Sequence, residues 1–264
     1  MAQPVTDLGA GKAPPPSFAP PVMLALCALA ACVFILALDV ALGGEGRAAA
    51  FWLGRGDSVF PYPFTIQNIE HALFFIALGE LFMRWRVAGA EAAFLRRGYL
   101  PEDDGTVLVL DDLGPLRRRL AGTFDADKGF LPYLIDLCIL QAQASRSVDQ
   151  TVSVLNATLE LMGHRVDLRY QLLRYLSWLI PTVGFIGTVA GIASALGLID
   201  PENMEIKLVT ANLAVAFDTT VIALLYSAVI VFLLNMVQKS EELALNGAGS
   251  YTLKNLINRL YIAD

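Results

Sequence analysis

Residues 178–191 read WLIPTVGFIGTVAG, and this glycine-rich stretch lies inside an apolar span that runs roughly from Arg174 to Ile199. A second apolar span runs roughly from Leu208 to Leu234 and contains the motif AFDTT at positions 216–220. A helix that crosses the bilayer core needs about 20 mainly apolar residues, and both spans are long enough. A charged side chain inside a span costs on the order of 3 kcal/mol, so Asp218 indicates a functional position.

The composition agrees with a membrane protein. Of the 264 residues, 56% are hydrophobic and 17% are charged, which is too apolar for an ordinary soluble domain. No basic run suits nucleic acid, so we expect no nucleic-acid partner. The sequence shows no nucleophile with a base, no metal-ligand spacing and no phosphate-binding glycine loop. We therefore expect no enzymatic activity, no metal and no cofactor.

The expected fold is an all-α integral membrane protein with about four transmembrane helices. A helical cytoplasmic section separates the second and third spans, and long helices extend into the cytoplasm. The first two spans run roughly from Pro21 to Leu42 and from Phe64 to Met83. The predicted segments are a disordered tail at 1–20, two spans with an external loop at 21–83, the cytoplasmic section at 84–173, the last two spans at 174–234 and a cytoplasmic C-terminal helix at 235–264.

Helical periodicity is clear in the cytoplasmic section. An amphipathic helix is predicted by the apolar residues Leu155, Leu159, Met162 and Val166, which recur every three or four positions. No strong stop signal precedes Trp178, so we expect this helix to run into the third span. The C-terminal helix is expected to break near Gly247-Ala248-Gly249.

The placement of Lys and Arg predicts the orientation. With four spans, 16 of the 19 basic residues lie in the two tails and between Arg84 and Arg174, and three lie on the other side, at Arg47, Arg55 and Lys207. Positive charge gathers on the cytoplasmic side of a membrane protein. Both termini are therefore expected in the cytoplasm, whereas three spans would put the tails on opposite sides.

Small residues mark one side of the third span. Gly184, Gly187 and Gly191 are spaced three or four apart, which lets helix backbones approach closely in lipid. Plain packing inside one subunit explains such a stripe as well as packing between subunits does. Pro181 frees one backbone carbonyl, which Thr182 or Thr188 could satisfy.

Asp218 has three physical explanations. It is protonated, it is hydrogen-bonded to Thr219, Thr182 or another hydroxyl, or it faces water. A hydroxyl such as that of Thr188 often bonds to its own helix backbone, so a pore role competes with a structural one. Helical spacing gives two stripes, one of Phe217, Thr220, Leu224 and Ser227, and one of Ala214, Asp218, Ile222 and Leu225.

Glu70 and His71 in the second span are less clear. His71 could titrate near neutral pH, but adjacent residues on a helix do not share a face. A structural role and a transport role both stay open for this pair.

The motifs at residues 178–192 and 213–220, with Ala223-Leu224 behind them, resemble the MotA/TolQ/ExbB proton-channel family. The resemblance covers roughly Tyr170 to Leu234 and implies a ring of five copies, in the bacterial inner membrane, around two copies of a single-span partner of the ExbD/TolR/MotB type. It implies that an Asp of the partner carries the proton and that Thr188 and Thr220 face it. Asp218, Thr219 and Thr182 complete the candidate pathway. H⁺ is the expected ion, and Na⁺ stays an alternative.

Two other classes of function remain. A non-conducting membrane scaffold would use the glycines only for oligomer packing. A solute transporter should show an internal repeat between its halves, yet the first two spans lack the glycine and threonine pattern of the last two. The sequence therefore favours a ring subunit that couples ion flow to mechanical work.

Overall fold

The computed structural model describes residues 20–43, 46–55, 60–103, 105–120, 129–199 and 206–262, and nearly all of them are helical. The predicted tail at residues 1–20 lies outside this part of the chain except for its last residue. The described residues form two compact units. We call residues 20–82 with 171–236 the apolar unit, and residues 83–170 with 237–262 the polar unit.

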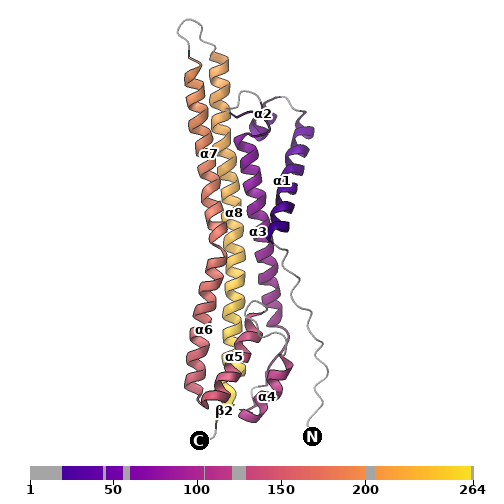
Figure 1. Cartoon of the computed structure of the whole chain (residues 1–264), viewed down its shortest axis with the longest axis vertical. Coiled ribbons are helices and arrows are strands. Elements are labelled where there is room, and N and C mark those ends of the chain that lie inside the picture. The colour runs from indigo at the N-terminus through magenta and orange to yellow at the C-terminus, as the bar shows by residue number, and fades with distance from the viewer. Residues whose placement is uncertain are drawn as a thin grey trace. The chain divides into compact units, whose positions relative to one another are not determined.

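The apolar unit is built from helices alone. It contains α1 (Pro20–Leu42), α2 (Arg47–Leu53), the start of α3 (Ile66–Phe94), α7 (Gln171–Gly197) and the start of α8 (Ile206–Asn255) (Figure 1). Thr65 precedes α3, where its hydroxyl oxygen accepts the Asn68 backbone N–H at 3.3 Å and donates to the Leu53 carbonyl at 2.8 Å. This cap satisfies a helix N-terminus and joins it to the end of α2.

Three helical stretches of the described chain are long and apolar enough to cross a membrane. They are Val22–Leu42, Val148–Gly197 and Ile206–Arg259, and they contain the first, third and fourth predicted spans. α3 is not among them, because polar residues occupy its first two turns. Those residues are nevertheless buried in the apolar unit, at Gln67, Asn68, Glu70 and His71. The fourth crossing therefore stays a prediction.

The third span packs against the fourth through its glycines. A methyl group built on Gly184 would lie 2.4 Å from the Cβ of Ala223, and one on Gly191 would lie 2.5 Å from the Cβ of Ala216. At Gly187 the nearest atom would be the hydroxyl oxygen of Thr219, at 2.6 Å. Any side chain at these positions would collide with α8, so the glycines set the close approach of α7 and α8.

The polar unit contains the end of α3, the helices α4 to α6 and the end of α8. It contains β1 (Leu108–Val109), α4 (Leu110–Arg119), α5 (Phe130–Ser145) and α6 (Val148–Arg169). The Ser147 side chain caps α6 by accepting the Gln150 backbone N–H. The predicted amphipathic helix is confirmed as α6, which buries Leu155, Met162 and Val166. The expected continuation into the third span is confirmed, since Val148–Gly197 is one helical stretch in which only Tyr170, in right-handed helical backbone conformation, separates the end of α6 from the start of α7.

The expected break near Gly247-Ala248-Gly249 is wrong, because α8 continues to Asn255. Added methyl groups on Gly247 and Gly249 would lie 2.9 Å from Leu95 and 2.7 Å from Leu159. These glycines therefore make room for neighbouring helices instead of ending their own.

A short C-terminal segment closes the polar unit. After α8, the 3₁₀ helix η2 (Ile257–Arg259) leads to β2 (Leu260–Tyr261), which pairs in parallel with β1. The Arg259 guanidinium donates to the carbonyls of Pro101 at 2.8 Å and Glu102 at 3.1 Å. The last described residues are thus folded against the chain rather than extended as a plain helix.

Glu91 and Glu241 are among the carboxylates buried in the polar unit. Glu241 on α8 accepts hydrogen bonds from Arg169 at 3.0 Å and from the Tyr170 hydroxyl at 2.8 Å. Glu91 on α3 accepts the Phe130 backbone N–H at 2.8 Å. Burial raises the pKa of Glu91 to about 7, and the negative charge of Glu241 adds to the rise, while the Phe130 N–H and Arg169 oppose it.

The raised pKa of Glu91 predicts a pH-dependent stability. Between about pH 4.5 and pH 7 the folded protein holds a proton that the unfolded chain has released. Stability from this group is therefore complete below about pH 4.5 and falls by roughly 3 kcal/mol as the pH rises through 7. Glu91→Gln should flatten that slope of the unfolding free energy, as measured by denaturant unfolding in detergent at several pH values. Equal slopes for both proteins would contradict the assignment.

Candidate functional site

A group of hydroxyls and backbone carbonyls, which we call the polar seam, lies between α7 and α8 inside the apolar unit. The Thr188 hydroxyl lies 3.0 Å from the Ala216 carbonyl oxygen across the helix pair and 3.3 Å from the Gly184 carbonyl of its own helix. It is also hydrogen-bonded to Thr220, whose hydroxyl lies 3.1 Å from the same Gly184 carbonyl. Both threonines are half-buried. Two consecutive helices therefore present a pair of hydroxyls at one place.

The seam continues to Pro181. A proline cannot donate a backbone hydrogen bond, so the carbonyl four residues earlier, that of Ser177, is left free. The Ser227 hydroxyl on α8 donates to it at 3.0 Å. We expected Thr182 or Thr188 in this role, but Thr182 donates to Trp178 of its own helix at 2.9 Å. Helical periodicity could have indicated Ser227 for this role, because it lies on the same stripe of α8 as Thr220.

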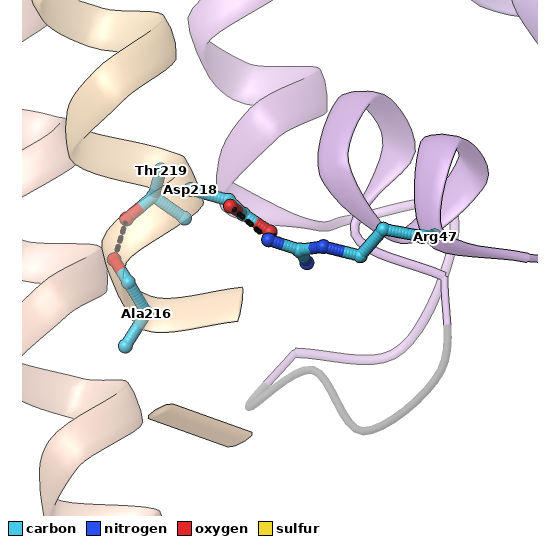
Figure 2. Close-up of polar contacts among 4 residues, drawn as sticks. All are labelled: Arg47, Ala216, Asp218 and Thr219. Carbon is cyan, nitrogen blue, oxygen red and sulfur yellow. Dashed lines mark hydrogen bonds and ion pairs between the residues drawn. The ribbon is translucent and has the colours of Figure 1, made fainter. Parts of the chain in front are cut away.

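Thr219 is buried on another side of α8. Its hydroxyl lies 2.8 Å from the Ala216 carbonyl oxygen and 3.1 Å from that of Gly184. Figure 2 shows Thr219 and Asp218 pointing in different directions from consecutive positions. The candidate pathway residues thus separate, with Thr188, Thr219 and Thr220 around Gly184 and Asp218 apart from them.

Asp218 forms a two-pronged ion pair with Arg47 of α2 (Figure 2). The two nitrogens of the guanidinium lie 2.5 Å and 2.7 Å from the two carboxylate oxygens. The Asp218 side chain is 7% exposed and that of Arg47 is 63% exposed. An ion pair was absent from the three explanations that we took from the sequence. A search for a counter-charge could have found it, because only Arg47, Arg55 and Lys207 lie on the predicted external side.

A second ion pair joins α1 to Arg55, the second residue after α2. Arg55 lies 2.7 Å from the Asp39 carboxylate. Asp39 lies in the last turn of α1, and the pairing gives it a counter-charge there. Asp218 and Asp39 are therefore each matched by an arginine.

Residues 134–246 match the family described as the MotA/TolQ/ExbB proton channel family. This part of the chain belongs to that family. The match includes Thr188, Thr220 and Ser227, and it excludes α1, α2 and the start of α3. No curated protein and no solved structure matches the chain.

The match of residues 134–246 to the MotA/TolQ/ExbB family implies a proton-channel role in ion-driven energy transduction. Members of the family generally oligomerise and work with a single-span partner. Together with the three candidate spans, the family indicates a multi-pass membrane protein. The polar seam lies inside the matched region, where a channel function would have to act.

Proposed function

We propose that the chain is a ring subunit of an inner-membrane channel and rotary motor driven by the proton-motive force. Five copies would surround two copies of a single-span partner that carries a membrane Asp, with both chain termini in the cytoplasm. H⁺ is the proposed ion, and Na⁺ is the alternative. Ion flow would be converted into mechanical work through the partner.

The observation that carries the proposal is the placement of Thr188 and Thr220. Their hydroxyls are half-buried, and exposed apolar side chains surround them, including Phe185, Phe217 and Leu224. An apolar surface with a small polar centre suits a partner helix that is apolar except for one carboxyl. The protonated and ionised forms of that carboxyl would differ in their affinity for the hydroxyls.

The energy source is sufficient for such a cycle. Each elementary charge that falls through 100 mV releases about 2.3 kcal/mol. A ligand shifts a conformational equilibrium only through different affinities for its states. The proton provides that difference, because it changes which contacts the partner carboxyl makes with each ring subunit.

Thr220→Val tests the proposal, because valine keeps the size of the side chain and removes its hydroxyl. We expect proton flux through the complex with its single-span partner to fall about tenfold or more, or about 1.4 kcal/mol in the barrier. The measurement is dye-detected flux into liposomes under an imposed potential.

Thr210→Val is the matched control. Thr210 also lies on α8, is exposed, and donates to the Ile206 carbonyl of its own helix at 2.9 Å. This variant should conduct like the unmodified protein. Full flux in a well-assembled Thr220→Val complex would remove Thr220 from the pathway, and absence of flux in the unmodified complex would favour a non-conducting scaffold.

A further inference from the structure

Glu70 on α3 is a fully buried carboxyl in the apolar unit. Its exposed fraction is 0%, and neither carboxyl oxygen has a hydrogen-bond partner among the described residues. An ionised carboxylate without partners in an apolar interior is strongly unfavourable. The arrangement therefore favours the neutral, protonated side chain.

The neighbouring His71 is held differently. One ring nitrogen lies 2.8 Å from the Trp52 carbonyl oxygen, so it donates there, and the other lies 2.8 Å from the Tyr226 hydroxyl. Both nitrogens of His71 are thus satisfied, which fits a structural role. Asp218, the nearest carboxylate along α8 to the seam, is matched by Arg47. Glu70 differs from both because no described residue forms a hydrogen bond or an ion pair with its carboxyl group.

Glu70 points at the polar seam. Its Oε1 atom would lie 3.2 Å from a methyl group built on Gly184. The carbonyl of Gly184 is the same group that lies within hydrogen-bond distance of Thr219 and Thr220. Because glycine has no side chain, position 184 leaves room for the Glu70 carboxyl beside the hydroxyls of Thr219 and Thr220.

A small cavity lies beside the hydroxyl of Thr219, one helical turn from Glu70, which does not itself line it. Its polar lining comes from Gln67, Asn212 and Thr219, and its apolar lining includes Phe60, which precedes α3. Gln67 lies one turn before Glu70, and its side-chain nitrogen also has no hydrogen-bond partner among the described residues. Unsatisfied polar groups around a cavity favour water. Water there would bring protons within a helical turn of Glu70.

We propose that Glu70 is a proton-binding site belonging to the ring subunit itself, separate from the carboxyl of the partner. The site deepens the proposed function and rests on it. A proton passes from water in the cavity to a carboxyl oxygen of Glu70, and the ionised form returns when the proton leaves toward the hydroxyls beside Gly184. No other bond is made or broken.

Carbodiimide labelling tests the protonation state without the partner. Dicyclohexylcarbodiimide modifies neutral carboxyls in apolar surroundings, and mass spectrometry of the full chain in detergent locates the product. We expect labelling at Glu70 that declines as the pH rises, and none at the equally buried Asp218. Absence of label on Glu70 at every pH would overturn the proposal whatever the ring conducts.

Flux through the complete complex tests the transport role. Glu70→Gln keeps the size and removes the exchangeable acid, so flux should fall about tenfold or more, while Glu70→Asp should recover part of it. Thermal unfolding and oligomer size should match those of the unmodified protein. Full flux in Glu70→Gln would overturn the proposal even if Glu70 is labelled. Loss of flux in Thr220→Val together with full flux in Glu70→Gln would leave the proposed function intact and remove only this site.

Discussion

Replacing Gly184 with alanine is expected to be one of the most destabilising methyl additions in α7. The new Cβ would lie 2.4 Å from the Cβ of Ala223 and 3.1 Å from the backbone oxygen of Thr219. A backbone atom cannot swing aside as a flexible side chain can, so α7 and α8 must separate. Overpacking of this kind costs about 1–3 kcal/mol, and we expect the upper end of that range here.

Separation of the helices would also open the hydroxyl cluster. Gly184→Ala should therefore reduce both the midpoint of thermal unfolding in detergent and the proton flux of the assembled complex. Gly163→Ala is the matched control, because Gly163 lies within α6 and no atom lies within 4 Å of the added methyl group. Alanine there should raise the stability by roughly 0.5–1 kcal/mol. Equal stability of the two variants would show that α7 and α8 are not closely packed at Gly184.

Replacing Arg47 with alanine is expected to give the second large effect. It leaves Asp218, whose side chain is 7% exposed in the intact pair, without a counter-charge. Breaking a buried ion pair by removing one partner costs about 3–5 kcal/mol. Because Arg47 is itself 63% exposed, water screens the pair, and we expect about 2 kcal/mol.

A double-mutant cycle isolates the pair. Adding Asp218→Asn to Arg47→Ala should recover much of the lost stability, because asparagine has no charge that would be left unpaired. Denaturant unfolding in detergent measures all four proteins. Additive effects of the two substitutions would mean that the ion pair contributes nothing to the fold.

Local periodicity accounts for what the sequence predicted well. Small residues at three- and four-residue spacing placed Gly184, Gly187 and Gly191 on one side of α7, and that side faces α8. The stripe of Phe217, Thr220, Leu224 and Ser227 was also expected from helical geometry alone. These features depend on neighbours within a few turns of one helix, which is the range over which a sequence pattern carries information.

Partners that are distant in sequence could not be predicted in this way. Arg47 and Asp218 are separated by 171 positions, and no spacing rule connects them. The hydroxyl that satisfies the carbonyl freed by Pro181 comes from Ser227, on the next helix. Local reasoning chose Thr182 because it considered one helix at a time. The glycines at 247 and 249 were misjudged for the same reason, since the side chains of Leu95 and Leu159 explain them.

The two arginine pairs have a consequence for the electric field at the end of the apolar unit that is predicted to lie outside the cytoplasm. A lone guanidinium about 10 Å from an arriving cation would repel it by roughly 0.4 kcal/mol in water and by more in a less polar setting. The Arg47 guanidinium is matched by Asp218 and that of Arg55 by Asp39. Each pair acts at a distance as a dipole rather than as a charge, so the potential falls off steeply. A positive ion that approaches this end of the apolar unit is therefore repelled less than it would be by two unmatched arginines.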